Sequence, residues 1–355
     1  MSESEIVTEI AGACAIATLN RPKALNALSH GMILALDRAL SQWEADSAVA
    51  VVVLRGVTSR AFCAGADIRA LYELGRAGAP ASGRAAQIAY FRDEYRLDRK
   101  IARFSKPIVA LVDGILMGGG AGLAINARHC VAGDAVVFAM PETGIGFFPD
   151  VGATRFLARL PGALGPYLAL TGARLSTGDM TALGLAGAHV AGARHEALIG
   201  RLGAGEAPTE AIAAEADAAP PSALLAERAA IDRCFSGASV VEIADRLAAD
   251  PSDFARAALA TLEQRSPTSL AVALRQMREG AAGPSIEEAL ALEFRIAQRI
   301  LAGHDYYEGV RAVIIDKDQS PRWRPAEIDG PRDEEVAAYF APLDVELDFP
   351  AQGSA

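Results

Sequence analysis

The sequence has few cysteines and no long uncharged apolar run, and each absence excludes a class of protein. Its 355 residues include four widely spaced cysteines with no C-x-x-C pair: Cys14, Cys63, Cys130 and Cys234. This spacing indicates buried thiols in a reducing compartment, not a disulfide framework or a zinc site. Charged residues interrupt every apolar run before the length of about 18 residues that a membrane helix needs. The acidic segment 1–5 is unlike a signal or transit peptide, so we expect a cytoplasmic protein.

Aromatic and basic residues are also scarce. Aromatic residues make up 6% of the chain, and its 34 Lys and Arg are outnumbered by 44 Asp and Glu. The net charge of −10 argues against nucleic acid or an anionic membrane as the main partner. An anionic small ligand remains compatible with this charge if backbone dipoles and a few basic side chains form its site. With 51% hydrophobic residues, the chain can bury a substantial core.

Several catalytic motifs are missing from the sequence. It contains no G-x-S-x-G, no G-x-x-x-x-G-K-[ST] and no H-E-x-x-H segment. The five histidines are scattered along the chain: His30, His129, His189, His195 and His304. Such scatter disfavours a metal site and a Ser-His-Asp triad, so we expect no metal. We expect Asp305 to be a helix N-cap, with Glu308 completing its capping box.

The first half of the chain alternates strand and helix patterns. Residues 6–19 predict a hairpin, and Ser29 is the expected N-cap of an amphipathic helix that ends near residue 43. Further along, we predict strands at 49–55 and 107–112, a helix at 85–104, a helix opened by glycines 118–120, and a strand at 135–138 into which residues 130–132 lead. This order predicts an α/β core with at least partly parallel strands.

From about residue 200 the pattern becomes helical. Four segments have helical periodicity: 240–247, 254–262, 269–278 and 286–301. The alanine-rich segment 203–219 fits either a loosely ordered connector or a peripheral helix. We therefore predict an α/β core with the active site over residues 1–200 and a mainly helical region over residues 201–355.

The segment 138–152 places two acids, Glu142 and Asp150, among apolar residues and turn formers. Loss of water around a carboxyl group raises its pKa toward neutrality and prepares it for acid–base chemistry. A helix start at Pro141 followed by a surface turn is the structural alternative. For two acids in an arbitrary loop that alternative would be favoured, because buried acids are rare.

Two glycine-rich turns follow predicted strands, at residues 62–68 and 117–122. A strand that ends in small residues and opens a helix leaves backbone N–H groups without acceptors. One N–H group from each turn could stabilise a developing oxyanion. The alternative is that the glycines only allow a helix to pack close to a strand.

Three segments carry a resemblance to a known family. They are 20–28 (NRPKALNAL), 61–68 (AFCAGADI) and 113–120 (DGILMGGG). Together they resemble the crotonase (enoyl-CoA hydratase/isomerase) superfamily. Further segments are similar to its 3-hydroxyisobutyryl-CoA hydrolase branch, which acts in valine catabolism: 91–95, 140–152, 266–270, 303–305 and 308–323.

The resemblance implies a spiral of repeated ββα and βαβ units that binds an acyl-CoA thioester. It implies oxyanion N–H groups at Ala66 and Gly119, and acids at the acyl end of the substrate at Glu94, Glu142 and Asp150. It also implies contacts with the CoA moiety from Lys23, Ala24, Leu25, Ala64, Asp67 and Ile68. Coenzyme A would be part of the substrate, with no separate cofactor. Trimers or pairs of trimers are common in the superfamily.

Residue 122 bears on the reaction type. Hydratases of the superfamily carry a glutamate there, paired with the one at Glu142, whereas this chain has Gly122 and an additional acid at Asp150. Thioester hydrolysis needs attack on the carbonyl and a stabilised oxyanion, which suits these residues better than water addition to a double bond. Glu142 would be either the nucleophile or the base for water, and Asp150 would bind the 3-hydroxyl group.

Two other functions remain compatible with the sequence. A hydratase or isomerase could use Asp150 in place of the missing glutamate. A protein that binds acyl-CoA without turnover is disfavoured, because both glycine turns and both acids are present.

Overall fold

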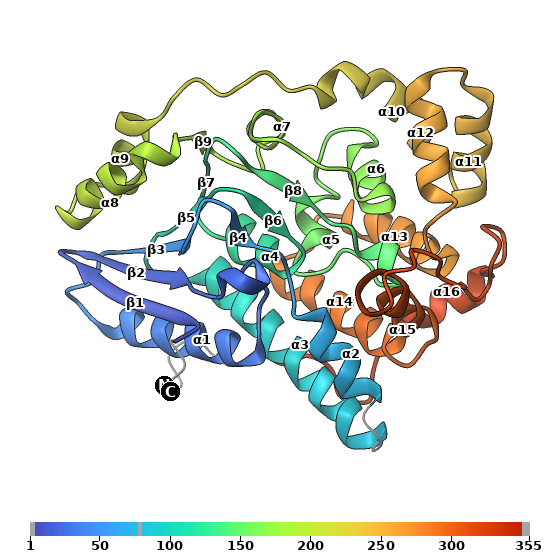
Figure 1. Cartoon of the computed structure of the whole chain (residues 1–355), viewed down its shortest axis with the longest axis horizontal. Helices are drawn as coiled ribbons and strands as arrows, with labels where there is room; N and C mark the ends of the chain where they lie inside the picture. The colour runs from blue at the N-terminus through green and yellow to red at the C-terminus, as the bar shows by residue number, and fades with distance from the viewer. Residues whose placement is uncertain (1–3, 77–79, 350–355) are drawn as a thin grey trace. The chain divides into compact units, whose positions relative to one another are not determined.

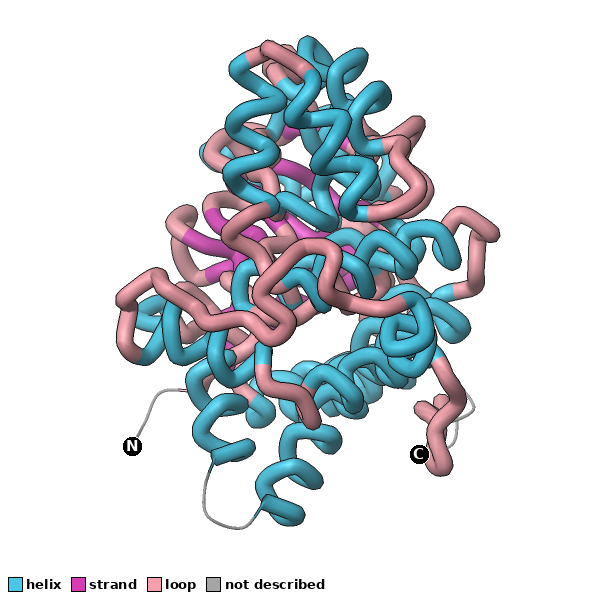
Figure 2. The backbone as a smooth tube through the Cα atoms, turned by 90° about the vertical axis from the view of Figure 1, so that its right-hand side faces the viewer, coloured by secondary structure: helices cyan, strands magenta, loops and turns pink. Residues whose placement is uncertain are grey.

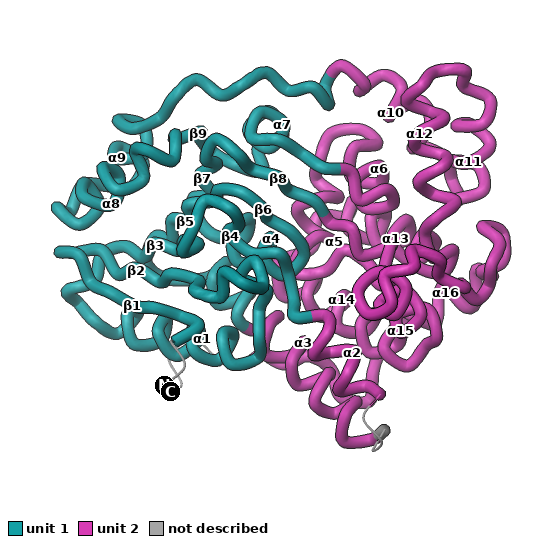
Figure 3. Tube along the Cα trace, in the orientation of Figure 1, with its two compact units in different colours: residues 1–67, 97–139, 174–225 teal, residues 68–96, 140–173, 226–355 magenta. Residues whose placement is uncertain are grey.

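The computed structural model describes residues 4–76 and 80–349, and these form two compact units. Unit 1 comprises residues 1–67, 97–139 and 174–225, and unit 2 comprises residues 68–96, 140–173 and 226–355 (Figure 3). The units interleave along the chain, whereas the division at residue 200 concerns composition and stays a prediction. Composition marks where helices replace strands, whereas a compact unit is defined by which segments pack together, and that is a tertiary property.

All strands formed by the described residues (Figures 1 and 2) belong to unit 1 (Figure 3). They are β1 Ile6–Ala11, β2 Cys14–Leu19, β3 Val51–Gly56, β4 Ala61–Cys63, β5 Ile108–Val112, β6 Ile115–Met117, β7 His129–Ala132, β8 Val137–Ala139 and β9 Ala188–His189. One sheet has the order β1-β2-β3-β5-β7-β9, and a second has the order β4-β6-β8. The β1–β2 pair is antiparallel and every other neighbouring pair is parallel.

The strand order is that of a spiral. Along the chain, β3, β5 and β7 enter the larger sheet, and each is followed at once by a strand of the smaller sheet, β4, β6 or β8. Every turn of the chain thus adds one strand to each sheet. The helices of unit 1 are α1 His30–Ala45, α4 Gly119–Ile125, α7 Thr177–Ala182, α8 His195–Gly203 and α9 Pro208–Glu215. The predicted α/β core with at least partly parallel strands is confirmed.

Local signals near the N-terminus also hold. The hairpin forms as β1 and β2, and the Ser29 side chain accepts a hydrogen bond from the Met32 N–H at 3.1 Å at the start of α1. The strand predicted at 135–138 forms as β8, and residues 130–132, predicted only to lead into it, form a strand of their own. Residues 130–132 are part of β7 in the larger sheet, and the next strand, β8, begins only at Val137 in the smaller sheet. A turn at Asp134 and Ala135 separates the two short strands.

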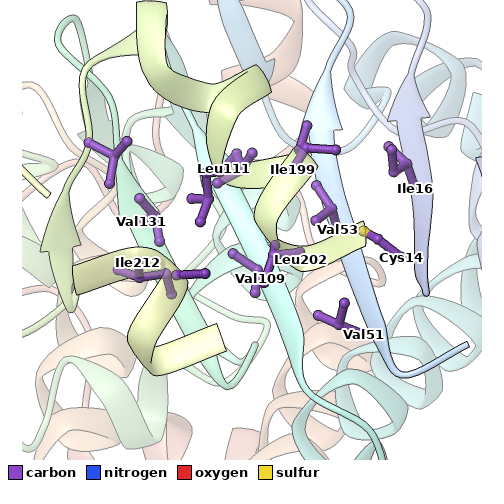
Figure 4. Packing of buried hydrophobic residues seen from close by; sticks show 13 residues of the cluster. Cys14, Ile16, Val51, Val53, Val109, Leu111, Val131, Ile199, Leu202 and Ile212 are labelled. Carbon is purple, nitrogen blue, oxygen red and sulfur yellow. The ribbon is translucent and has the colours of Figure 1, made fainter. Parts of the chain in front are cut away.

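Helices α8 and α9 cover one face of the larger sheet (Figure 4). Leu202 and Ile199 of α8 and Ile212 of α9 pack with Val53 and Val109 in a single buried cluster. Burial of each such aliphatic side chain contributes about 1.5–3 kcal/mol to folding. The alanine-rich segment therefore contains a packed helix, α9, in keeping with the helical alternative rather than the connector.

Unit 2 is built from helices in its described part. They are α2 Ile68–Arg76, α3 Pro80–Arg103 (assigned to unit 2 as far as Arg96), α5 Ala153–Phe156, α6 Leu164–Thr171, α10 Arg228–Phe235, α11 Val240–Ala249, α12 Asp253–Leu262, α13 Pro267–Gly280, α14 Ile286–Ile300, α15 Asp305–Val310 and α16 Asp333–Phe340. Serine N-caps start four of them, α11 to α14, as the sequence pattern of polar residues before apolar runs favours. None of the helices formed by the described residues is both long and apolar enough for a bilayer crossing.

The predicted cap at Asp305 was wrong. Helix α15 has His304 at its N-cap, and the buried Asp305 carboxylate instead accepts hydrogen bonds from the Ser266 hydroxyl at 2.6 Å and the Arg324 N–H at 2.8 Å. Glu308 pairs with Arg311 at 2.8 Å. The Asp305 carboxylate thus has partners that are distant along the chain, which a local capping rule does not foresee, whereas Glu308 pairs within its own helix region.

Candidate active site

The turn after β4 leaves the Ala66 N–H group without a partner in its own bridge. Gly65 adopts a left-handed φ of 99°. In the parallel bridge between Leu28 and Ala66, the Leu28 N–H donates to the Gly65 carbonyl at 2.7 Å, and the Asp67 N–H donates to the Leu28 carbonyl at 2.9 Å. These bonds occupy the Gly65 carbonyl and the Asp67 N–H, the groups on either side of Ala66. The N–H of Ala66 therefore points away from Leu28, as an oxyanion donor requires.

The second donor lies at the start of α4. Gly118 has φ 48° and ψ −127°, a conformation that turns the chain from β6 into the helix, and Gly119 is the first helical residue. The first N–H groups of a helix have no acceptor within it. No side chain caps α4. The Gly119 N–H is therefore available for a ligand.

The two turns are neighbours within unit 1. A Cβ atom at Gly65 would lie 3.6 Å from the Gly119 nitrogen, and one at Gly120 would lie 2.7 Å from the Cys63 carbonyl oxygen. The glycines therefore do permit close packing of α4 against β4, as the structural alternative held. The same packing places the two donor-bearing segments side by side, so close packing is compatible with the oxyanion interpretation, which stays a prediction.

The predicted CoA-binding segments also meet in unit 1. Residues Pro22–Ala24 form a 3-10 turn, and Leu25 follows it in the left-handed region with φ 53°. The Ala64 N–H donates to the Leu25 carbonyl at 3.0 Å, which joins the two segments. Lys23 is exposed, and Asp67 pairs with Arg21 at 2.7 Å.

Among the other predicted CoA-binding residues, Ala24 belongs to this same turn, whereas Ile68 begins α2 in unit 2. The structure therefore brings five of the six predicted CoA-binding residues into one unit.

Three acids are buried in unit 2. Glu94 lies in α3, Glu142 begins a 3-10 turn over Glu142–Ile145, and Asp150 lies in the loop before α5; their exposed fractions are 1%, 7% and 5%. The Tyr95 hydroxyl donates a hydrogen bond of 2.8 Å to Asp150 Oδ2. The surface-turn alternative for Glu142 and Asp150 is thereby wrong, because both side chains are inside the protein.

The environment of these acids favours their protonated forms. Burial raises the pKa of Glu142 well above its usual value, and the nearby Asp150 charge raises it further. The pKa of Glu94 is raised by the same two causes, again with burial first. Burial raises the pKa of Asp150 to about 7, against the lowering effect of the Tyr95 hydrogen bond. Acids with pKa values moved toward neutrality can both accept and release a proton at physiological pH.

Aromatic side chains of unit 2 pack against one another. Phe91 and Phe147 stack with their centroids 5.4 Å apart, and Phe147 also contacts Phe148 at 4.8 Å and Tyr306 at 5.8 Å. In the described part of the chain, seven buried side-chain atoms have no hydrogen-bond partner, and they include Glu94 Oε1, Glu142 Oε2 and the Tyr306 hydroxyl. Unsatisfied buried polar atoms are uncommon in folded proteins, and a polar ligand is one explanation for them.

Sequence reasoning did not identify Tyr95, Glu293 or Gln276, which contact the Asp150 loop. Glu293 is fully buried in α14 and accepts hydrogen bonds from the Gly152 and Thr154 N–H groups. Its sequence signal was a glutamate on the apolar side of an amphipathic helix, next to Phe294. Such a residue has to find a buried polar partner.

No set of three or more His, Cys, Asp or Glu side chains in residues 4–76 and 80–349 is arranged to hold a metal ion. The four cysteines are buried thiols, as predicted. Asp316 and Asp318 both pair with Arg311, at 2.7 and 2.6 Å.

The spiral of paired strands, the adjacent glycine turns and the buried acids define the class of protein. The chain belongs to the enoyl-CoA hydratase/isomerase family, whose family model matches residues 14–340. The predicted superfamily and fold are confirmed by this match together with two crystal structures of the same fold. One, described as a carnitinyl-CoA dehydratase from Mycobacterium thermoresistibile, is 38% identical with a TM-score of 0.92 and covers 99% of this chain and 100% of that one. The other, described as an enoyl-CoA hydratase from Rhodobacter sphaeroides 2.4.1, is 41% identical with a TM-score of 0.92 and covers 98% and 100%.

Within the family, the chain is similar to hydrolases over nearly its whole length. It is 44% identical over 351 residues to a Danio rerio protein named 3-hydroxyisobutyryl-CoA hydrolase, mitochondrial, which covers 96% of this chain and 90% of the relative. It is 40% identical over 349 residues to the Homo sapiens protein of the same name, with coverage of 96% and 89%. The resemblance to the hydrolase branch is thereby confirmed.

Proposed function

We propose that this protein hydrolyses the thioester of a short 3-hydroxyacyl-CoA, with 3-hydroxyisobutyryl-CoA as the first candidate. The products are the free hydroxy acid and coenzyme A. The observation that carries the proposal concerns the acids: residue 122 is glycine, and the acid whose charge acts on Glu142 is Asp150. This pair lacks the second glutamate of a hydratase, but it can provide the acid–base groups for attack on a thioester carbonyl.

The backbone N–H groups of Ala66 and Gly119 polarise the thioester carbonyl and stabilise the oxyanion that forms on it. Two donors aimed at a developing oxyanion typically supply several kcal/mol of the barrier reduction. Their adjacency in unit 1 supports this role, because both donors would have to reach the same oxygen.

Glu142 starts the reaction in one of two ways. As a base it takes a proton from water while the water oxygen forms the new bond to the carbonyl carbon. As a nucleophile it forms a mixed anhydride that water then cleaves. In both routes the carbon–sulfur bond breaks, and the proton of water finally resides on the CoA thiol. Asp150 accepts a hydrogen bond from the 3-hydroxyl group, and Glu94 contributes to the acyl end.

The test is release of the CoA thiol. Glu142→Gln keeps the size of the side chain but removes the carboxylate, so we expect thiol release from 3-hydroxyisobutyryl-CoA to fall by at least about a thousandfold, as for loss of a nucleophile or base. The exposed Glu263→Gln is the matched control and should keep wild-type turnover. Near wild-type turnover in folded Glu142→Gln would refute the assignment.

A second function has support in the descriptions of the two solved structures, a dehydratase and a hydratase. An enzyme of that kind would remove the enoyl absorbance of crotonyl-CoA without releasing thiol. Parallel assays of absorbance and thiol release on crotonyl-CoA and 3-hydroxyisobutyryl-CoA separate the two reactions.

The remaining parts of the proposal concern binding and location. Lys23, Ala24, Leu25, Ala64, Asp67 and Ile68 would contact the CoA moiety, which enters as substrate, and no further cofactor is needed for hydrolysis. A homo-oligomer, trimer or hexamer, is the assembly we propose from the family. Buried thiols support a reducing compartment such as the cytoplasm, although the named relatives are mitochondrial.

A further inference from the structure

The loop that carries Asp150 contains strained backbone. Val151 has φ 54° and Gly152 has φ 96°, so two consecutive residues adopt the left-handed region. A β-branched residue rarely adopts this region, because its Cβ approaches the backbone too closely. Such strain persists only where the surroundings impose it, and it concentrates at functional sites.

Two side chains from neighbouring helices impose this conformation. Glu293 of α14 accepts hydrogen bonds from the Gly152 N–H at 2.8 Å and the Thr154 N–H at 2.9 Å, one on each carboxylate oxygen. Gln276 of α13 donates to the Pro149 carbonyl at 2.6 Å and to the Thr154 hydroxyl at 2.8 Å. The backbone is thus held immediately before and immediately after Asp150.

A buried carboxylate is a costly way to hold a loop, because it must leave water without a cationic partner in compensation. Burial raises the pKa of Glu293 to about 8, against the lowering effect of the hydrogen bonds from Thr154 and Gly152, so the carboxylate that accepts both bonds is the main form above about pH 8. A loop that served only to connect elements would not need it. The residue whose backbone is held by these contacts is Asp150, and its side chain accepts a separate hydrogen bond from the Tyr95 hydroxyl.

We propose that Glu293 is a positioning residue for the hydrolysis: its two hydrogen bonds hold the left-handed turn after Asp150 and so aim that carboxylate at the acyl group. This inference rests on the proposed function, in which Asp150 contacts the 3-hydroxyl group. Glu293 acts on the reaction only through the turn.

The first experiment compares Glu293→Gln with a control on the same helix. The amide retains one acceptor but turns an N–H group toward the second donor, so one hydrogen bond is lost. We expect kcat for thiol release to fall about tenfold or more, with KM changed less than about threefold, since a misplaced group costs rate rather than binding. Glu288→Gln makes the same change in the exposed capping box of α14 and should keep wild-type kcat.

A rescue experiment tests the route through the turn. Val151→Gly removes the strain, so the turn no longer depends on the carboxylate. Added to the Glu293→Gln background, it should raise kcat severalfold toward the wild-type value. This double variant also decides the matter if Glu293→Gln alone fails to fold, because relief of strain should restore folding and kcat together. A role confined to stability predicts a restored melting temperature without a restored kcat, and that result would overturn the inference.

Asp150→Asn, assayed beside these variants, separates this inference from the proposed function. Turnover that survives in Asp150→Asn removes Asp150 from the proposed mechanism itself. Loss of turnover in Asp150→Asn, with wild-type kcat in folded Glu293→Gln, refutes only the positioning role.

Discussion

Replacement of Asp150 by asparagine should make the protein more stable at neutral and alkaline pH while it abolishes turnover. Asparagine has the same shape as aspartate and keeps an oxygen that can accept the Tyr95 hydrogen bond of 2.8 Å. What it removes is a buried group that has to ionise as the pH rises. Residues that serve catalysis in this way commonly reduce stability.

The magnitude follows from the pKa of the carboxyl group. Its rise from 3.8 to about 7 corresponds to about 4 kcal/mol of free energy of unfolding. Because the folded-state pKa lies above the unfolded one, the stabilisation is fully present below about pH 4 and is lost as the pH rises through about 7. The Asp150 charge also raises the pKa of Glu94 and Glu142, so its removal reduces their pH dependence in the same direction.

The assay is urea unfolding of wild type and Asp150→Asn at several values between pH 5 and pH 8. Between pH 5 and 7 the free energy of unfolding of the wild type should fall by about 2–3 kcal/mol more than that of the variant. Asp253→Asn, at a side chain that is 98% exposed, should follow the wild type. Equal slopes for wild type and Asp150→Asn would refute the claim that Asp150 is buried with a raised pKa.

Two further substitutions test other parts of the site. Tyr95→Phe removes the hydrogen bond that lowers the pKa of Asp150. The acidic limb of the pH profile of thiol release should therefore move to higher pH, and the free energy of unfolding should fall by about 1 kcal/mol. An acidic limb at the wild-type pH would contradict this role of Tyr95. Gly120→Ala places a Cβ 2.7 Å from the Cys63 carbonyl oxygen, so α4 should shift. The free energy of unfolding should fall by about 1–3 kcal/mol, and most of the turnover should be lost. Gly200→Ala, where nothing lies within 4 Å, is the control, and equal activity of the two alanine variants would contradict the close packing of α4.

Local signals in the sequence determined the elements and their type. The apolar run at 49–55 became β3, the serine before a helical pattern became the cap of α1, and the glycines at 118–120 opened α4. Each of these outcomes depends on residues close together in the chain, through strand propensity, capping or left-handed backbone. The glycine at position 122 favours hydrolysis through the resemblance to the family, because hydratases of that family carry a glutamate there.

Only the tertiary structure decided the surroundings of Asp150. Tyr95 lies 55 residues away along the chain, and Glu293 lies 141 residues from its hydrogen-bond partner Gly152. Periodicity indicates which face of a helix is buried, but not what that face is buried against. The pKa of a carboxyl group depends on the water, charges and donors that folding brings to it. The two acids were therefore visible in the sequence, whereas their burial, their pKa values and the backbone that holds Asp150 were products of the packing of α3, α13 and α14.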